Sequence, residues 1–338
     1  MRKPITLLWS LRSPCNLGCR YCYFGTIEEH RGRPTRPVGQ LSHLSRDDLK
    51  ADEVFAFART LGHSPVGRVY VAGGEPLIWP PILDLLKILK EAGIEVVVCT
   101  NGIPLARKEI LTGLVSLGID AVSVSLDSTD PAYNDLWRPA RNGADGWTQV
   151  INGIRATRHA TPRLRIGVYS VITRCNIPQV VQVARLAADL GCDYYVPQPV
   201  ALDTTHRLHK ELSLRVSDIP TIQEAFAELY AAGLPLTLPH PGFPTQVIAS
   251  ISHATATVQN CFGGHTLHFI QPDGTVWDCP SSLRIAATPE GRRKTIKGHS
   301  AIEIFPEPRG CRASCALFSR DCVNMWPLMD GVPLERAA

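Results

Sequence analysis

Short apolar stretches alternate with amphipathic stretches along the first 200 residues. Runs of roughly four to eight β-branched and other apolar residues favour buried strands, whereas apolar positions spaced by three and four favour helices. We expect strands at Ile5–Leu11, Arg68–Ala72, Ile94–Cys99, Ala121–Leu126, Ile166–Ile172 and Asp193–Pro197. We expect helices at Arg46–Leu61 (with Ser45 as its N-cap), Pro81–Ala92, Leu105–Leu117, Trp147–His159 and Pro178–Leu190.

This alternation predicts right-handed βαβ units and an α/β fold with a parallel sheet. Too few units are present for an eight-stranded barrel, so an open partial (β/α)6 barrel or a doubly wound sheet is expected. After residue 200 we expect one helix, Ile219–Ala232, among proline-rich connections. Thr266–Ile270 and Thr275–Cys279 flank Pro-Asp-Gly, which is typical of a β-hairpin turn.

The C-terminal part is expected to form a small domain of its own. From Gly310 onward the chain is rich in cysteine and has little periodicity, which is typical of a segment held by a metal centre. We therefore divide the chain into a barrel (1–200), a helical and proline-rich connection (201–255) and a hairpin with a cysteine-rich tail (256–338).

Composition excludes several classes of protein. A formal net charge of +4 is too small to indicate a nucleic-acid partner. No run approaches the roughly 20 apolar residues of a membrane span, and the N-terminus lacks a signal-peptide cleavage site. The chain has 11 cysteines, an odd number, without a secretory signal. This favours metal or redox chemistry in a reducing compartment, so we expect a cytoplasmic protein without membrane contact.

Three cysteines follow the first expected strand at CxxxCxxC spacing: Cys15, Cys19 and Cys22. Three thiolates can hold three irons of a [4Fe–4S] cubane and leave the fourth iron open for a ligand. A structural zinc site would need a fourth ligand, and the nearest spare one is His30. A zinc-stapled binding protein is the non-enzymatic alternative.

This motif, with Tyr21 before its last cysteine, resembles the signature of the radical S-adenosylmethionine (SAM) family. Further segments resemble family motifs in the same order along the chain: Gly73-Gly74-Glu75-Pro76 at the end of the second strand, Thr100-Asn101-Gly102 after the third, Ser123 to Asp127 on the fourth, and Arg138. The resemblance implies an active site at the carboxyl ends of the barrel strands.

The resemblance also implies the cofactors. A [4Fe–4S] cluster on the three cysteines, reduced by a donor such as flavodoxin or ferredoxin, would cleave bound SAM to a 5′-deoxyadenosyl radical that abstracts hydrogen from an unactivated C–H bond. The residues implied to contact SAM are Tyr21, Gly73, Gly74, Glu75, Pro76, Asn101, Ser123, Ser125, Asp127 and Arg138. The glycines are expected to let the methionine part of SAM approach the backbone closely.

The tail resembles the auxiliary-cluster extension called SPASM, or its shorter twitch form. Cys261 and Cys279 flank Gly274 at the spacing of that element, whereas Cys311, Cys315 and Cys322 depart from the SPASM spacing. These five cysteines are too few for two clusters of four ligands each, which favours the twitch form. We expect one auxiliary [4Fe–4S] cluster and a spare thiol. The spacing does not settle which of these three tail cysteines bind it.

Several residues are candidates for substrate contact. Arg31, Arg33 and Arg36 lie in a basic loop expected at the barrel mouth, where guanidinium groups grip phosphate or carboxylate, although such a loop can be simply solvated. Tyr195, Gln198 and His206 lie on or after the sixth strand, and His206 is equally compatible with a surface loop.

Three isolated cysteines receive different expectations. Cys175 follows the fifth strand at the same mouth and is a candidate hydrogen donor to a substrate radical, with an inert thiol as the alternative. Cys99 and Cys192 are expected to serve only packing.

These features predict a radical SAM enzyme of natural-product, antibiotic-type biosynthesis. Its expected substrate is a small polar sugar or nucleoside, with or without a phosphate group. Its expected reaction is dehydrogenation, epimerisation or carbon–carbon bond formation. The early position of Cys15 leaves no room for an N-terminal peptide-recognition domain, which favours the small substrate. The alternative is a maturase that crosslinks or epimerises a ribosomal peptide.

Overall fold

The structure is a computed structural model that describes most of the chain. The described residues are 4–23, 47–202, 204, 206–252, 257–281, 294–308, 314–315 and 319–330. The arginines at 31, 33 and 36 and the cysteine at 311 lie outside them.

The described strands form one sheet in the order β6-β5-β4-β3-β2-β1-β7-β8-β9. Strands β1 to β6 pair in parallel, and β7 adds to β1 in parallel before the sheet turns antiparallel at β8 and β9. The strands are β1 (Ile5–Arg12), β2 (Val66–Gly73), β3 (Glu95–Thr100), β4 (Ala121–Ser125), β5 (Arg165–Ile172), β6 (Tyr194–Pro199), β7 (Leu267–Ile270), β8 (Thr275–Trp277) and β9 (Lys294–Thr295). The expected parallel α/β fold is confirmed.

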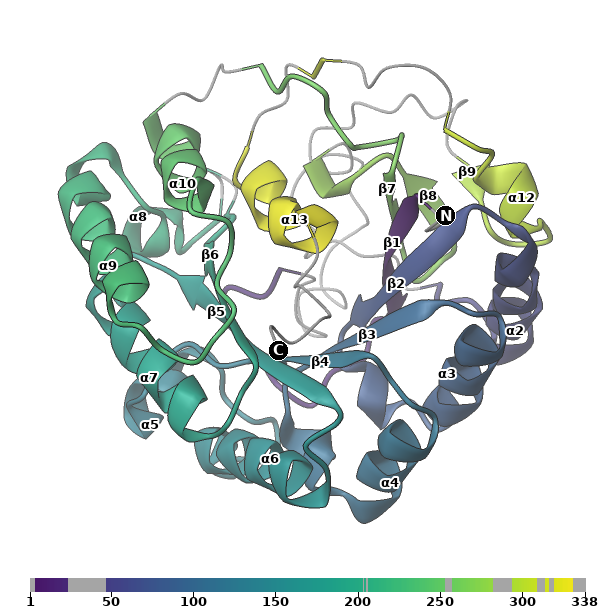
Figure 1. The fold of residues 1–338 in the computed structure, drawn as a ribbon, viewed down its shortest axis with the longest axis horizontal. Helices are drawn as coiled ribbons and strands as arrows, with labels where there is room; N and C mark the ends of the chain where they lie inside the picture. Colours follow the sequence, from purple (N-terminus) through teal and green to yellow (C-terminus); the bar gives the residue numbers. More distant parts are fainter. Residues whose placement is uncertain are drawn as a thin grey trace.

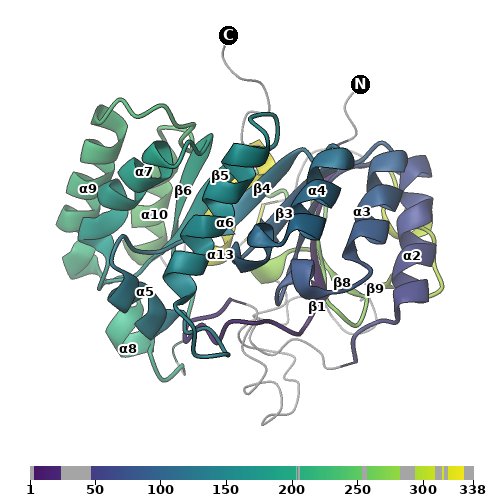
Figure 2. The same cartoon turned by 90° about the horizontal axis from the view of Figure 1, so that it is seen from below.

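The helices between successive strands cover the outer face of the curved sheet, and the barrel stays open (Figures 1 and 2). The helices are α2 (Ala51–Thr60), α3 (Ile82–Glu91), α4 (Lys108–Ser116), α5 (Pro131–Trp137), α6 (Gly146–Ala160), α7 (Val180–Asp189), α8 (His209–Leu212), α9 (Ile219–Ala231), α10 (Phe243–Ser252), α12 (Ala301–Ile304) and α13 (Arg320–Asp330). None of the helices in the described residues is long and apolar enough to cross a membrane.

The start of α2 differs from the expectation. Its N-cap is Lys50, whose backbone N–H donates to the Glu53 carboxylate at 2.9 Å. Just before it, the Leu49 N–H donates to the Pro272 carbonyl at 2.8 Å, at the turn of the β7–β8 hairpin. Helix α2 therefore begins at Ala51, directly after this contact with the hairpin, and Ser45 lies outside the described residues.

Both faces of the sheet are buried, as expected for parallel strands with helices outside and a filled interior. In β1, Leu7 and Trp9 pack outward against the helices, whereas Leu8 packs inward. The inner cluster also takes in Phe269 of the hairpin and Met325 of α13. The interior of the open barrel is therefore filled partly by the C-terminal segment.

Helix α13 was not expected from the sequence, because the tail shows little periodicity. Figure 1 shows α13 inside the concave side of the sheet, with α10 as its neighbour. Near its end, the Leu328 carbonyl accepts hydrogen bonds from the Arg68 guanidinium at 3.2 Å and the Tyr70 hydroxyl at 3.4 Å. These inward-pointing side chains of β2 fix the helix inside the barrel.

Residues 256–338 are thus joined to the barrel by sheet pairing, since β7 pairs with β1. The hairpin itself forms as expected, with the Gly274 N–H donating to the Gln271 carbonyl at 2.9 Å and Gly274 at a φ of +84°. The division into three parts stays a prediction.

Candidate active site

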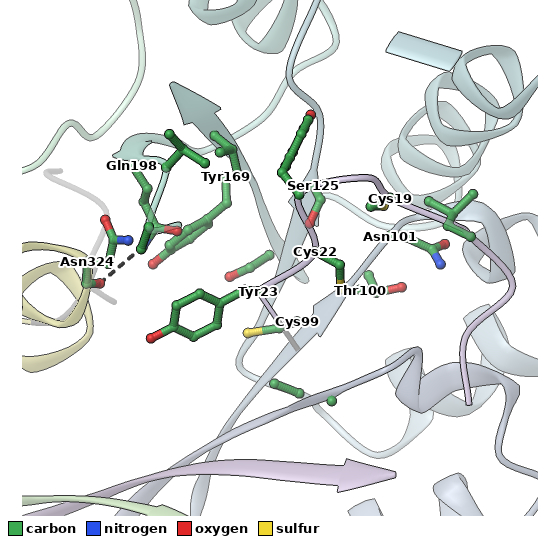
Figure 3. A pocket seen from close by; sticks show the side chains of 18 of the residues that line it. Cys19, Cys22, Tyr23, Cys99, Thr100, Asn101, Ser125, Tyr169, Gln198 and Asn324 are labelled. Carbon is green, nitrogen blue, oxygen red and sulfur yellow. Dashed lines mark hydrogen bonds between the residues drawn. The ribbon is translucent and has the colours of Figure 1, made fainter. Parts of the chain in front are cut away.

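A cavity of about 230 Å³ lies at the carboxyl ends of the strands, between the cysteine segment and α13. The end of β2 and the residue after it contribute Ala72, Gly73 and Gly74, the end of β3 and the residue after it contribute Cys99, Thr100 and Asn101, and β4 contributes Ser123 and Ser125. The other lining residues are Leu8, Cys15, Leu17, Cys19, Tyr21, Cys22, Tyr23, Arg138, Tyr169, Val171, Gln198, Pro199, Val200, Ala201, Asn324, Met325 and Leu328. Figure 3 shows most of these side chains. The cavity brings together residues from the whole length of the chain.

The segment with the three N-terminal cysteines is held on both sides. The Gly18 N–H donates to the Pro139 carbonyl at 2.8 Å, and the Arg20 N–H to the Trp137 carbonyl at 2.9 Å. On the thiol side, the Leu17 N–H lies 3.4 Å and the Asn101 Nδ2 3.9 Å from the Cys15 Sγ. N–H groups directed at a sulfur stabilise a thiolate and tune a bound metal centre.

These thiols fit an iron–sulfur cluster better than a single metal ion. Among the described residues, no three cysteine, histidine or acidic side chains converge on one ion. A cubane takes one thiolate per iron, so its ligands need not converge. Burial raises the pKa of Cys15 to about 12 and also raises that of Cys19, so both thiols ionise readily only when a cation such as iron is bound.

Gly73, the last residue of β2, and Gly74 after it are packed closely against the chain's own backbone. A Cβ on Gly73 would lie 2.6 Å from the Arg12 carbonyl oxygen, and one on Gly74 only 2.1 Å from that of Pro14. Gly73 also has a φ of +131°, which other residues rarely adopt. The missing side chains therefore make room for the chain's own cysteine segment, and since both glycines also line the cavity, their contact with SAM stays a prediction.

Glu75 does not line the cavity and instead ties two strand ends together. Its buried carboxylate accepts hydrogen bonds from the Leu77 N–H at 3.0 Å, the Thr100 hydroxyl at 2.8 Å and the Asn101 N–H at 2.7 Å. Burial raises its pKa to about 7, against the effect of these hydrogen bonds. Glu75 thus holds Asn101 beside the cysteines, while the neighbouring Pro76 is buried at the start of a short 3₁₀ turn.

A second buried carboxylate, Asp127, organises the opposite side. It accepts hydrogen bonds from the Tyr21 hydroxyl at 2.6 Å, the Arg138 guanidinium at 2.8 Å and the Val171 N–H at 2.6 Å. The Asp127 and Arg138 side chains are 0% and 7% exposed. Asp127 itself does not reach the cavity, whereas Tyr21 and Arg138 line it. This network connects the cysteine segment to β4 and β5.

The family model described as the radical SAM superfamily matches residues 13–187, just over half of the chain. The chain belongs to the radical SAM superfamily. It is a radical SAM enzyme that binds SAM and a [4Fe–4S] cluster. The matched segment includes the three cysteines and the ends of β2, β3 and β4, which meet at the cavity.

Curated relatives extend the match beyond this segment. The chain is 27% identical to a PqqA peptide cyclase of Streptomyces rochei over 85% of this chain and 72% of that protein. It is 26% identical to the mycofactocin maturase MftC of Mycobacterium ulcerans over 83% of this chain and 69% of that protein. It also matches an AdoMet-dependent heme synthase of Methanosarcina barkeri at 28% identity over 57% of this chain, and spans about half (49%) of that relative.

Solved structures share the fold at low sequence identity. SuiB of Streptococcus suis bound to its precursor peptide SuiA aligns with a TM-score of 0.60 and 14% identity over 98% of this chain and 67% of that one. Native anSMEcpe with bound AdoMet aligns with a TM-score of 0.64 and 16% identity over 90% of this chain and 81% of that one. The likeness extends over the C-terminal part as well as the radical SAM barrel.

The remaining expected substrate residues are placed differently from one another. Gln198 lines the cavity. Tyr195 does not, because it points outward from β6 into the core. His206 lies in the turn before α8, where its Nδ1 accepts from the Leu208 N–H. Cys175 is exposed, with its Sγ 3.9 Å from the Glu211 carbonyl, and does not line the cavity.

Cys99 is one of the cavity residues that the sequence interpretation missed. It was expected to serve only packing, but it lines the radical SAM cavity (Figure 3). Burial raises the pKa of its thiol to about 12. Cys192 lies in the core as expected. Strands buried on both faces carry no alternation that shows which face a residue occupies, so the placement of Cys99 had no signal in the sequence.

Four cysteines of the C-terminal part lie near one another. The Gly263 N–H donates to the Cys261 Sγ at 3.4 Å, and a Cβ on Gly263 would lie 3.3 Å from the Cys279 Sγ. Burial, followed by the nearby Cys315 and Cys322 thiols, raises the pKa of Cys261 to about 11. Cys315 is brought there by backbone hydrogen bonds with Val258 in both directions, at 2.7 and 2.8 Å.

Proposed function

We propose that this radical SAM enzyme is a peptide maturase, which modifies an unactivated C–H position of a ribosomal peptide. The observation that carries the proposal is the charge of the cavity. Among the described residues that line it, Arg138 is the single charged side chain, and its guanidinium is paired with Asp127. A binding site for a phosphorylated sugar would need cations free to pair with the phosphate.

The relatives support the same choice. A PqqA peptide cyclase and a mycofactocin maturase each match more than four fifths of the chain, and the SuiB structure of similar fold holds a precursor peptide. None of these names a sugar or a nucleoside. The small-substrate expectation rested on the early position of Cys15 and on Arg31, Arg33 and Arg36, and these arginines lie outside the described residues.

The chain's own residues would serve the reaction in three ways. Cys15, Cys19 and Cys22 would hold the cluster, and the polar groups of Asn101, Ser123 and Ser125 line the space beside it where SAM would lie. When bound, SAM and the reduced cluster supply the radical that abstracts hydrogen. Apolar residues of the lining would shield that radical from water, among them Val171, Met325 and Leu328.

We also propose that the second group of cysteines binds one auxiliary [4Fe–4S] cluster. Cys261, Cys279, Cys315 and Cys322 supply four thiols around Gly263, the number that a fully ligated cubane takes. Of the three tail cysteines, Cys315 and Cys322 are thus proposed as cluster ligands, and Cys311 is proposed as the spare thiol. The cluster would exchange an electron with the substrate or with an external donor such as ferredoxin.

Iron content tests the two clusters. Anaerobically reconstituted protein should hold about eight irons per chain, and a Cys15/Cys19/Cys22→Ala variant or a Cys261/Cys279→Ala variant about four. Cys311→Ala is the matched control and should keep about eight. Only the variant of the N-terminal cysteines should lose SAM cleavage. Loss of half of the iron in Cys311→Ala would contradict the proposed ligand set.

The substrate class is tested by the release of 5′-deoxyadenosine on addition of substrate. The reduced holoenzyme with SAM is mixed in turn with short peptides encoded beside its gene and with a panel of nucleotide sugars. The proposal expects saturable release above the uncoupled background with a peptide, and a mass change of that peptide. Saturable release with a nucleotide sugar alone would overturn the proposal in favour of the small-substrate function.

A further inference from the structure

The side of the cavity away from the cysteines carries three uncharged polar side chains from separate elements. Gln198 lies on β6, Asn324 on α13 and Tyr169 on β5. Figure 3 shows them together on one side, with Cys19, Thr100 and Asn101 on the other. The Gln198 Nε2 donates to the Asn324 backbone carbonyl at 3.0 Å, which joins α13 to the end of β6.

The side-chain amide of Asn324 has a defined orientation. The residue is 7% exposed, and its Nδ2 donates to the Pro199 backbone carbonyl at 3.1 Å. A carbonyl only accepts hydrogen bonds, so the nitrogen must face Pro199 and the Oδ1 must point elsewhere. That buried Oδ1 has no hydrogen-bond partner among the described residues. An acceptor buried in this way is unfavourable unless a bound molecule supplies a donor.

The Tyr169 hydroxyl is a second buried polar group without a hydrogen-bond partner among the described residues. It belongs to a side chain that lines the cavity. A hydroxyl can donate one hydrogen bond, whereas the Asn324 Oδ1 can only accept. An acceptor and a donor on one uncharged wall complement the N–H and C=O groups of an amide.

We propose that this wall binds the backbone of the peptide substrate, with the Asn324 Oδ1 accepting a peptide N–H and the Tyr169 hydroxyl donating to a peptide carbonyl. This inference rests on the proposed peptide-maturase function and names the two side chains that recognise the substrate. They act as positioning residues, which hold the peptide against α13 and opposite the cluster. Because they contact backbone groups, they place few limits on the side chains of the bound peptide.

The test measures binding without turnover. Holoenzyme with an oxidised cluster and SAM is dialysed to equilibrium against a library of N-acetylated hexapeptide amides that is randomised at every position. Mass spectrometry measures the retained fraction. Asn324→Leu, which is similar in size but lacks the acceptor, should weaken retention roughly 10- to 100-fold. Tyr169→Phe should weaken it in the same direction. Asn142→Leu, the same substitution at an exposed position outside the cavity, should leave it unchanged.

A second arm of the test changes the ligand. Its first measurement is made on the wild type and therefore does not depend on how well a variant folds. Depsipeptides in which each internal amide in turn is replaced by an ester lack one N–H. In the wild type, one ester position should weaken binding roughly tenfold, and in Asn324→Leu that difference should vanish. Iron content and SAM affinity by calorimetry, measured on every variant, should match the wild type.

The outcomes separate the two proposals. Equal retention by the wild type and Asn324→Leu, or equal binding of every ester and its amide by the wild type, would overturn the role of this wall and leave the peptide function standing. Absence of retention by the wild type, together with retention of a nucleotide sugar, would overturn the peptide function and this inference with it.

Discussion

Replacing Gly74 by alanine should cost the protein its N-terminal iron–sulfur cluster as well as its affinity for SAM. The added Cβ would lie 2.1 Å from the Pro14 carbonyl oxygen, whereas real Cβ contacts are not closer than 3.0 Å. The Pro14 backbone must therefore move by at least 0.9 Å. Pro14 directly precedes Cys15, so the shift displaces the first cluster ligand.

The energetic cost has two parts. Gly74 donates its N–H to the Arg12 carbonyl at 2.7 Å, and the Glu75 N–H donates to that of Pro14 at 2.9 Å. Forcing an extra methyl group into a packed region costs typically 1–3 kcal/mol, and each hydrogen bond contributes about 0.5–1.5 kcal/mol. The variant is thus expected to lose about 2–6 kcal/mol, a large share of the 5–15 kcal/mol that stabilises a typical domain.

The assay combines three measurements on anaerobically reconstituted protein: iron per chain, the denaturant midpoint, and SAM affinity by calorimetry. Gly62→Ala is the matched control, because its Cβ would lie 3.5 Å from its nearest neighbour, which is an ordinary contact. We expect Gly74→Ala to lose about half of the iron, and Gly62→Ala to resemble the wild type. Full iron content with lost SAM affinity would refute this reasoning and show that the glycine instead makes room for SAM.

Two further predictions concern buried charges. Arg138→Met should destabilise the protein by about 3–5 kcal/mol in urea unfolding, because it leaves the Asp127 carboxylate buried without its cation. The control Arg185→Met, at an exposed pair with Glu228, should cost less than about 1 kcal/mol. Equal effects of the two substitutions would contradict a stabilising role of the buried ion pair. The pKa of Glu75 is raised to about 7 by burial, so the wild type should lose stability relative to Glu75→Gln as the pH rises from about 4.5 to 7, with no further relative change above that. A relative stability that is flat or rises over this range would disprove the raised pKa.

The sequence by itself determined the parallel sheet, most of its strands and outer helices, the hairpin and the radical SAM identity. Local pattern was sufficient for these features. Apolar runs fix strand and helix because their periodicity is local, and the Pro-Asp-Gly turn fixes the hairpin in the same way. The three N-terminal cysteines lie close in sequence, and the carboxyl ends of parallel strands share one edge, so motifs far apart along the chain had to meet there.

Only the tertiary structure decided what individual side chains do at that edge. Glu75 and Asp127 look like SAM contacts in the sequence, but neither lines the cavity. Their carboxylates accept hydrogen bonds from the end of β3, from β5 and from Arg138. Cys99 and Tyr195 lie in strands that are buried on both faces, so the apolar pattern does not show which of them points into the cavity.

The position of α13 depends on contacts from sequence-distant residues. Arg68 and Tyr70 bind its Leu328 carbonyl, and Gln198 binds its Asn324 carbonyl, from strands more than 120 residues away along the chain. Such long-range contacts leave no periodic trace in the tail itself. The wall that we propose for peptide binding therefore becomes visible only when β5, β6 and α13 are brought together in the folded chain.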